Sequence, residues 1–311
     1  DSEKLLDLLV EFKKHGMTSI LISHKIQEIK KVADVITILR DGATIETLEK
    51  NRDEITESRI IRDMVGRDLT HRFPPRESTI GETIFEVRDW NVYHPTHSDR
   101  KVCKEVNLSV KKGEVVGIAG LMGAGRTELA MSIFGHAYGR HITGKVLLHN
   151  REIDVSSVEK AVKNGIAYAT EDRKSLGLVL IQDVKSNVTL ANLENIKDGM
   201  FIGSHKELQA ATYYKNKLSI RCSNIMQKTV NLSGGNQQKV VISKWLFADP
   251  EVLILDEPTR GIDVGAKFEI YTIINKLASE GKAIILISSE LPEILGVCDR
   301  IYIMNEGKIV G

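Results

Sequence analysis

The sequence predicts an α/β fold whose buried, mostly parallel sheet carries its chemistry beyond the carboxyl ends of the strands. Three observations support this prediction. The run Val252–Leu255 is wholly apolar, is too short for a helix, and ends in two adjacent carboxylates. A second apolar run, Val115–Ala119, leads directly into a glycine-rich loop, and a segment starting at Ser233 opens a helical stretch. Open α/β sheets bind their ligands in the crevice beyond such strand ends.

The two carboxylates that end the first run are Asp256 and Glu257. Burying two acids is costly unless a cation or a proton transfer uses them. Magnesium prefers oxygen ligands, and a water that attacks a phosphate must be oriented. Standing alone, the segment would indicate only a strand followed by an acidic turn.

The loop after Ala119 has the spacing of a phosphate-binding loop, GxxxxGK[ST], with arginine in place of lysine. Its glycines let backbone N–H groups converge on phosphates, and the next helix offers its positive N-terminus. Thr127 is placed to ligate Mg²⁺, and Arg126 can reach the terminal phosphates. The residues predicted to bind a nucleotide here are Gly120, Leu121, Met122, Gly123, Ala124, Gly125, Arg126, Thr127 and Glu128.

The segment Asn231–Asn236 lies between this loop and the acidic strand and reads NLSGGN. With it, the sequence resembles the ATP-binding cassette (ABC) ATPases, whose phosphate loop, LSGG signature and LILDEP strand occur in this order. The resemblance implies a mixed β-sheet core of the RecA-like type, an antiparallel β subdomain and a helical signature subdomain. It also implies that Asp256 holds Mg²⁺, that Glu257 is the general base and that Asp263 is the D-loop residue. The implied signature residues are Leu232, Ser233, Gly234, Gly235 and Asn236.

The composition is that of an ordinary globular protein. The 311 residues are 42% hydrophobic and 27% charged, with a net charge of +1, and no apolar run is long enough to span a bilayer. Near-neutral charge gives no support to a nucleic-acid partner. The three cysteines form no CxxC pair, which argues against a zinc site and favours a reducing compartment.

An internal repeat relates the two ends of the chain. The first forty-six residues match the last forty-six at an offset of 265 positions, so that Gly16 falls on Gly281 and Asp34 on Asp299. Both copies predict a helix, a buried strand, a short helix, a strand and a tight turn. The strand of the first copy is expected at Ile20–Ser23. Its unpaired edge, around Ser19–Ser23, should pair with something, such as a second molecule.

From the repeat we expect a fragment of a tandem two-cassette protein. Residues 1–46 would be the C-terminal tail of a first cassette, 47–80 a connector and 81–311 a nearly complete second cassette. In the connector, Thr56 caps a short amphipathic helix that Gly66 ends. Farther on we expect a first strand at 83–87, a hairpin turn at 111–113, a buried strand at 165–170 and a helix at 208–218.

Three further positions take roles from the resemblance. His24 aligns with Ser289, where the family places a histidine that contacts the γ-phosphate, although a lone histidine is normally a surface residue. Tyr93 stands where the family stacks an aromatic ring on adenine, the alternative being a core or loop aromatic. Glu171 stands where the family has a glutamine that touches Mg²⁺, the alternative being a solvated acidic loop.

In the family, ATP is sandwiched between the phosphate loop of one cassette and the signature of the other. Ser233 to Gly235, together with His24, would then serve ATP bound by a first cassette or a second copy. The site of the second cassette departs from the family pattern at Arg126, Glu171 and Ser289. We expect it to bind ATP and hydrolyse it slowly, and the isolated fragment to be weak or inactive.

The run Asp256–Lys267, together with Glu171–Lys174, narrows the resemblance to the ATPase subunits of monosaccharide importers. Systems for ribose, xylose, arabinose, galactose and multiple sugars share this layout, and Tyr93–Pro95 is most similar to the xylose or multiple-sugar branch. The implied cofactors are ATP and Mg²⁺. The implied partners are a transmembrane permease contacted through residues 171–230 and, indirectly, a periplasmic sugar-binding protein, with no nucleic acid. The implied location is peripheral, on the cytoplasmic face of the membrane.

Three alternatives stay open. A soluble ABC ATPase of translation or DNA repair would usually carry basic surfaces, coiled-coil inserts or a zinc-hook CxxC, which the sequence lacks. A regulatory nucleotide-binding module would fit a chain without a complete active site. An importer of nucleosides or a signalling sugar would keep the mechanism and change the cargo.

Overall fold

The computed structural model describes residues 2–23, 25–40, 42–66 and 73–311. The chain divides into two compact units, one made of residues 1–72 with 263–268 and the other of 73–262 with 269–311.

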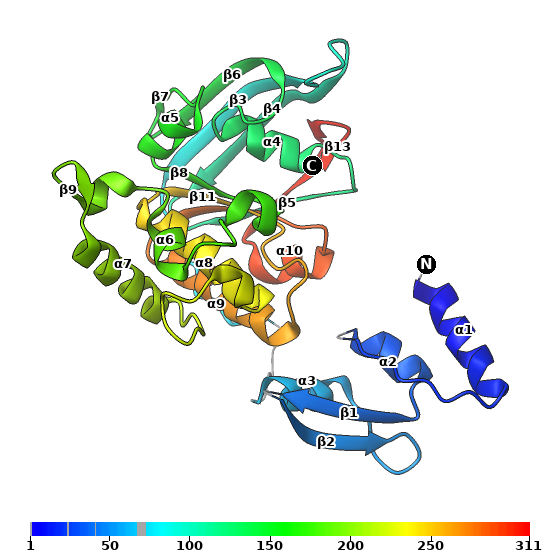
Figure 1. Cartoon of the computed structure of the whole chain (residues 1–311). Helices are drawn as coiled ribbons and strands as arrows, with labels where there is room; N and C mark the ends of the chain where they lie inside the picture. Colours follow the sequence, from blue (N-terminus) through cyan, green and yellow to red (C-terminus); the bar gives the residue numbers. More distant parts are fainter. Residues whose placement is uncertain (1, 24, 41, 67–72) are drawn as a thin grey trace. The chain divides into compact units, whose positions relative to one another are not determined.

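The larger unit is built on a sheet in the order β14-β13-β5-β12-β11-β8 (Figure 1). Every pairing in it is parallel except that of β13 with β14. All five residues of β11 and all five of β12 are buried, as expected of central strands. This confirms the predicted α/β fold and its buried parallel strands. The bounds are β5 Val115–Gly120, β8 Ile166–Ala169, β11 Val252–Asp256, β12 Ala283–Ile287, β13 Arg300–Asn305 and β14 Lys308–Ile309.

A second, antiparallel sheet has the order β4-β3-β6-β7. Its strands are β3 Thr83–Tyr93, β4 Lys101–Lys111, β6 Arg140–Leu148 and β7 Arg151–Glu152. The hairpin predicted at 111–113 is wrong, because β4 pairs in this sheet whereas β5 pairs in the other. The turn instead passes the chain between sheets. It is held by the carboxylate of Glu114, which accepts from the N–H of Lys111 at 2.7 Å.

Helices complete the larger unit. Around the main sheet are α4 Arg126–Ile133, α5 Val158–Lys163, α10 Leu291–Val297 and, from Glu269 on, the helix α9 Val264–Ser279. A helical region contains α6 Val184–Thr189, α7 Ser204–Lys217 and α8 Gly234–Phe247, with the short turns η1 Arg173–Gly177, η2 Leu193–Ile196 and η3 Thr229–Asn231 and the hairpin of β9 Lys197–Asp198 and β10 Phe201–Ile202. In the described part of the chain, no helix is both long and apolar enough to cross a membrane.

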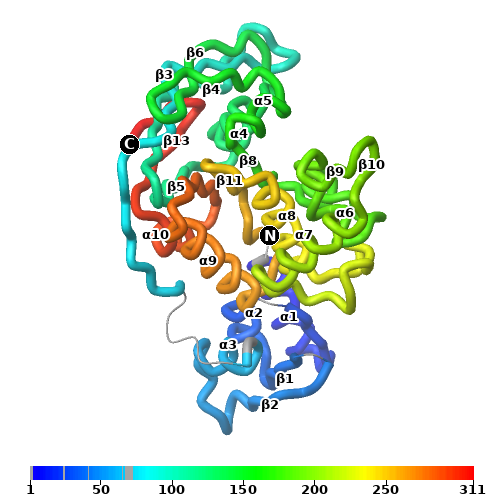
Figure 2. The backbone as a smooth tube through the Cα atoms, turned by 90° about the vertical axis from the view of Figure 1, so that its left-hand side faces the viewer, coloured from blue at the N-terminus to red at the C-terminus, as the bar shows by residue number. Residues whose placement is uncertain are grey.

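Residues 73–80 form a strap, an extended segment that Figure 2 shows in cyan beside α10. The ring of Phe73 packs on Tyr271 with centroids 5.2 Å apart and fills the space where a side chain at Gly296 would lie. The guanidinium of Arg76 pairs with Asp299 at 2.9 Å, and both side chains are nearly buried. The strap is therefore part of the larger unit. The expected connector, residues 47–80, is divided between the two units, since its residues up to 72 belong to the smaller unit.

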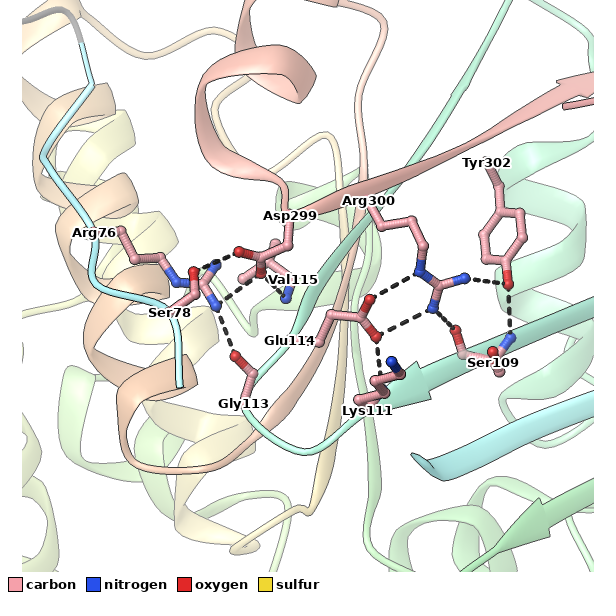
Figure 3. A network of polar contacts seen from close by, with 10 residues as sticks. All are labelled: Arg76, Ser78, Ser109, Lys111, Gly113, Glu114, Val115, Asp299, Arg300 and Tyr302. Carbon is pink, nitrogen blue, oxygen red and sulfur yellow. Dashed lines mark hydrogen bonds and ion pairs between the residues drawn. The ribbon is translucent and has the colours of Figure 1, made fainter. Parts of the chain in front are cut away.

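Figure 3 shows how Asp299 and the neighbouring Arg300 tie the strap and the two sheets together. Asp299 accepts from the N–H of Val115 at 2.8 Å, at the first residue of β5. Arg300 donates to both carboxylate oxygens of Glu114, and its Nη1 lies 2.6 Å from the hydroxyl of Tyr302. This bidentate pairing with Glu114 raises the pKa of Arg300.

The smaller unit contains α1 Ser2–Lys14, α2 Ile26–Val32, β1 Val35–Arg40, β2 Ala43–Glu49 and α3 Glu57–Val65. Its core consists of Ile26, Ile36, Ile38, Leu48 and Ile60. The hydroxyl of Thr56 accepts from the N–H of Arg59, and Gly66 ends α3 in the left-handed region at φ 82°. The predicted cap, helix and stop are confirmed.

The strand predicted at Ile20–Ser23 is wrong. Residues 17–23 form no strand, and the side chains of Ile20 and Ile22 are 92% and 93% exposed. The matching strand β12 owes its ladder to β11 and β5 on either side. Residues 20–23 have no such ladder in the smaller unit, so their apolar pattern alone does not make a strand.

Candidate functional site

The glycine-rich loop joins β5 to α4 as the sequence predicts. Gly123 has φ 79° and open space where a Cβ would stand, whereas a Cβ on Gly125 (φ 100°) would lie 2.8 Å from the carbonyl oxygen of Val102. The side chains of Leu121 and Met122 point into solvent, at 79% and 97% exposure. The loop therefore presents backbone rather than side chains, and it ends at the N-terminus of α4, the arrangement that binds anions.

Asp256, the last residue of β11, is fully buried. Its Oδ2 accepts a hydrogen bond from the hydroxyl of Tyr168 at 2.9 Å, whereas Oδ1 is buried with no hydrogen-bond partner among the described residues. Burial raises the pKa of Asp256 to about 6, against the opposing effect of the nearby hydroxyls of Thr127 and Tyr168. An unsatisfied carboxylate oxygen near a threonine hydroxyl is a donor set that fits Mg²⁺, which keeps water or phosphate oxygens at its other positions.

Glu257 follows directly, in the left-handed region at φ 47°. Its N–H donates to the carbonyl of Ile287 at the end of β12, at 2.9 Å. A left-handed backbone is strained for a residue with a side chain, and such strained residues cluster at functional sites. The backbone of Glu257 is thus fixed at the end of β12, directly after Asp256.

Arg126, at the first turn of α4, connects the loop to both strand ends. Its Nη1 donates to the carbonyl of Ser288 at 2.6 Å, and its Nη2 lies 3.8 Å from Oε1 of Glu257. The side chains of Arg126 and Glu257 are 10% and 9% exposed. The fork of a guanidinium reaches two acceptors at once, which a lysine ammonium on a single stem does less well.

Ser289 is exposed after β12, and the residue before it is locked in a buried network. The hydroxyl of Ser288 hydrogen-bonds to the buried carboxylate of Glu293, which also accepts from Thr259 at 2.9 Å. Glu293 on α10 therefore braces the loops that follow β11 and β12. Sequence reasoning missed this brace, because a glutamate in an amphipathic helix gives no sign of being buried.

The signature segment forms the N-terminus of α8. Ser233 is the N-cap residue and is exposed, and its hydroxyl accepts from the side chain of Asn236 at 2.9 Å. Leu232 and Gly235 are buried, which anchors the segment, while Gly234 is half-buried. A helix N-terminus with an exposed hydroxyl and small residues suits the approach of a phosphate.

Glu171 and Arg173 both reach the loop that follows β11. The carboxylate of Glu171 forms an ion pair with Arg260. The guanidinium of Arg173 donates to the carbonyls of Arg260 at 2.8 Å and Gly261 at 3.4 Å. The structure thus engages Glu171 with an arginine of this loop.

Lys244 is a buried cation that the sequence analysis did not predict. It lies on α8 with 7% exposure and donates to the carbonyl of Gly177 at 2.7 Å. Burial lowers the pKa of Lys244 to about 8. Tyr168 was also missed as a partner of Asp256, because a tyrosine in an apolar strand gives no signal of its hydrogen bond.

Tyr93 ends β3, with the Nζ of Lys101 5.3 Å from its ring centroid and the ring of His141 edge-on at 6.1 Å. Asp263 precedes α9, and its Oδ1 accepts from the N–H of Ala266 at 2.9 Å. His24 lies outside the described residues.

Taken together, these contacts bring the glycine-rich loop close to Arg126, Thr127, Asp256 and Glu257.

A P-loop before a helix, an acidic central strand and a glycine signature at a second helix define a nucleotide-binding cassette. The sequence matches the family described as ABC transporter over residues 103–260, about half of the chain. The chain belongs to the ABC transporter family.

The relatives by sequence include sugar-import proteins. The L-arabinose transport ATP-binding protein AraG of Geobacillus stearothermophilus is 61% identical over the whole of this chain and 61% of its own length. The xylose import ATP-binding protein XylG of Thermoanaerobacter pseudethanolicus is 51% identical over the same shares. The galactose/methyl galactoside import ATP-binding protein MglA of Clostridium tetani is 45% identical over 99% of this chain and 59% of its own. The chain spans about three fifths of these relatives.

Solved structures agree on the fold. A nucleotide-free ATP-binding cassette from an ABC transporter has a TM-score of 0.64 at 22% identity, covering 74% of this chain and 90% of its own. A dimeric bacterial ABC transporter cassette has a TM-score of 0.62 at 22% identity, covering 73% and 97%. The ABC ATPase fold predicted from the motifs is confirmed.

Proposed function

We propose that this chain is part of the ATP-binding subunit of a monosaccharide importer, and that it binds ATP and Mg²⁺ at the loop after β5. The observation that carries the proposal is the convergence of Arg126, Thr127, Asp256 and Glu257 at the ends of β5 and β11. The sugar-import names of relatives up to 61% identical support the choice of transport over translation or DNA repair.

Each residue has a proposed task. The backbone of 120–125 and the helix N-terminus bind the phosphates, and Tyr93 stacks on the base. Thr127 and Asp256 hold Mg²⁺, which neutralises phosphate charge when bound. Glu257 accepts the proton of the attacking water and orients it.

We propose that this site binds ATP and hydrolyses it slowly. Ser289 carries no imidazole to contact a γ-phosphate, and Arg126 is already engaged by Ser288 and Glu257. An arginine committed to two acceptors must exchange at least one of them for a phosphate. Losing the histidine removes a donor at the reacting phosphate, so turnover suffers more than binding.

The repeat supports a tandem arrangement, in which residues 1–46 are the tail of another cassette. At the offset of 265, α2 falls on α10 and β1 falls on β13, with identical bounds. The local turn is also shared, since the N–H of Lys25 donates to the hydroxyl of Ser23 at 3.1 Å and that of Glu290 to Ser288 at 3.0 Å. Within this arrangement the signature of α8 completes the ATP site of the other cassette, to which His24 contributes.

A permease is the proposed partner, contacted through residues 171–230, with a periplasmic sugar-binding protein engaged indirectly. Apolar side chains in this stretch are strongly exposed, among them Ile181 at 75%, Met200 at 94% and Phe201 at 80%. Exposed apolar side chains that adjoin one another, as those of the consecutive residues Met200 and Phe201 do in the chain, favour a protein interface. The proposed place is the cytoplasmic face of the membrane, held there by the permease.

The test is the steady-state ATPase of the intact subunit with its permease, comparing His24→Ala with Glu257→Gln. The proposal expects His24→Ala to abolish turnover and Glu257→Gln to leave a substantial part of it. If both changes silence the protein, both sites hydrolyse or are obligatorily coupled, and the slow-site proposal is wrong. ATPase activity stimulated by ribosomes or DNA instead of the permease would overturn the importer proposal.

A further inference from the structure

The side chain of Arg173, in the loop that follows β8, contacts the loop after β11 and lies close to the signature at the start of α8. This residue begins the π-helical turn η1, whose N-cap Asp172 accepts from the N–H groups of Lys174 and Ser175. The neighbouring strands β8 and β11 are parallel, so the loops at their carboxyl ends lie next to each other. Arg173 extends from the first of these loops to the second.

The contacts of the guanidinium are specific. Nη1 donates to the carbonyl of Arg260 at 2.8 Å, and Nη2 lies 3.4 Å from the carbonyl of Gly261. Gly261 is in the left-handed region at φ 67°, which turns its carbonyl toward the arginine at a residue type that tolerates this conformation. The planar fork thus holds the backbone of the loop after Glu257, rather than any side chain of it.

The same guanidinium abuts the signature. A Cβ built on Gly234 would stand 2.8 Å from Nη2 of Arg173 and 3.2 Å from both the carbonyl of Gly261 and the side chain of Ile262. Gly234, at the start of α8, is therefore needed as glycine so that the arginine and the loop after β11 can both reach the helix. A cation at the positive end of a helix is electrostatically unfavourable, and the two carbonyls offset this cost.

The far end of η1 is fixed to the same helix. Gly177 packs on Val241 of α8, and its carbonyl accepts from the buried Lys244. The loop after β8 is thus hydrogen-bonded to α8 at Gly177, and Arg173 lies against the first turn of the same helix at Gly234. A bond at one end and a close approach at the other leave the segment between them little freedom.

We propose that Arg173 is a positioning residue that holds the loop Arg260–Ile262 against the N-terminus of α8, so that the signature and the loop after the general base adopt one arrangement. Its hydrogen bonds, in the described part of the chain, go to the loop after β11 and none goes to Gly120–Gly125. The functional consequence rests on the function proposed above: removing Arg173 impairs the ATP site that the signature completes and spares binding at this chain's own phosphate loop.

The experiment uses the intact subunit and compares Arg173→Ala and Arg173→Lys with the wild type. Hydrogen exchange followed by mass spectrometry reports peptides covering 231–237 and 258–262 without nucleotide. Arg173→Ala should accelerate exchange in both peptides by about tenfold, the effect of losing a charged hydrogen bond to a carbonyl. Arg173→Lys, which keeps one donor group, should give a smaller acceleration. If Arg173→Ala does not fold, the exchange of Arg173→Lys alone is compared with that of the wild type.

The matched control is Arg88→Ala, which removes an exposed arginine from the antiparallel sheet, where it pairs with the nearby Glu86. It should leave both peptides unchanged. If Arg173→Ala accelerates exchange only within 171–177, or in neither peptide, the positioning role is wrong. General acceleration over the whole unit in Arg173→Lys also contradicts it, because that would signify global loosening.

A second readout separates the inference from the proposed function. Binding of a fluorescent ATP analogue should stay within about twofold in Arg173→Lys, while ATPase turnover with the permease falls roughly tenfold. If the wild-type subunit shows no permease-stimulated ATPase, the proposed function fails, and the exchange result still decides the positioning role. If turnover is unaffected although exchange increases, the functional consequence is overturned.

Discussion

Nη2 of Arg126 lies 3.8 Å from Oε1 of Glu257, with both side chains about nine-tenths buried. The same guanidinium donates to the carbonyl of Ser288 at 2.6 Å. The arginine of the phosphate loop therefore lies close enough to offset the charge of the proposed general base. A phosphate that attracts Arg126 would release Glu257 at the same moment.

Arg126→Lys should destabilise the nucleotide-free protein by about 1–2 kcal/mol, because one of two acceptors loses its charged donor. Added Mg-ATP should remove most of this difference, since the nucleotide offers the lysine a new acceptor. Urea unfolding with and without Mg-ATP measures both values. An equal loss under both conditions would mean that the contacts to Ser288 and Glu257 persist when nucleotide is bound.

Ser289→His should increase hydrolysis at this chain's own site by at least about tenfold, because a donor at the reacting phosphate contributes in that range or above. The side chain at this position is exposed, so the imidazole has room. Turnover is measured in the intact subunit carrying His24→Ala, which silences the other proposed site. Glu257→Gln added to this background is the control and should abolish the gain. Unchanged turnover would count against the slow-site proposal.

Tyr168→Phe should lower the free energy of unfolding by about 1–3 kcal/mol, because it leaves the buried Oδ2 of Asp256 without its donor. Mg-dependent nucleotide binding should also weaken several-fold, since the carboxylate is less firmly oriented. Denaturant unfolding and a fluorescent ATP analogue give the two values. Tyr213→Phe is the matched control: its side chain is 57% exposed, so its change should stay within about 0.5 kcal/mol. Equal effects of both changes would contradict the prediction.

Lys244→Met should remove a pH dependence of stability. Burial lowers the pKa of Lys244 to about 8, from an ordinary value of 10.5. Between these values the unfolded chain holds one more proton than the folded one, so this residue makes the free energy of unfolding rise with pH, by up to about 1.4 kcal/mol per unit. Below pH 8 its contribution is constant.

Urea unfolding at several pH values between 8 and 9.5 tests this, with the wild-type minus Lys244→Met difference as the readout. Lys206→Met is the matched control, because Lys206 also donates to a backbone carbonyl but is exposed. A difference curve that is flat with pH would show that Lys244 keeps its proton in the folded protein.

Gly125→Ala should destabilise the phosphate loop far more than Gly123→Ala. Both glycines have positive φ, but a Cβ on Gly125 would meet the carbonyl of Val102 and the methyl of Met304 at 3.0 Å, whereas one on Gly123 meets nothing within 4 Å. We expect a loss of about 1 kcal/mol at Gly123 and about 2–4 kcal/mol at Gly125. Thermal unfolding compares them, and similar losses would refute the steric argument.

The sequence was sufficient for the strands and loops whose chemistry is local. Buried runs such as Val252–Leu255 became central strands, and Thr56 with Gly66 capped α3 as predicted. Prediction failed where the structure of a segment depends on which strand it pairs with. Ile20–Ser23 has the apolar pattern of β12 but none of its neighbours, and the chain at 111–115 changes sheets instead of turning back.

In the candidate site, too, residues of local motifs were predicted, whereas residues that act on distant partners were not. The glycine spacing and the acidic strand end made Thr127 and Asp256 predicted site residues from residue order alone. Tyr168, Arg173 and Lys244 were not identifiable, because each acts on a group distant in sequence and none belongs to a motif whose chemistry needs it. Only the assembled sheet reveals which hydroxyl, guanidinium or ammonium faces which acceptor.

The strap carries a consequence for how this sequence can vary. The ring of Phe73 fills the space above Gly296, so a side chain at position 296 would collide with it. A larger residue at 296 therefore requires a smaller one at 73. Among natural variants the two should change together, a statistical trace of one contact between the strap and α10.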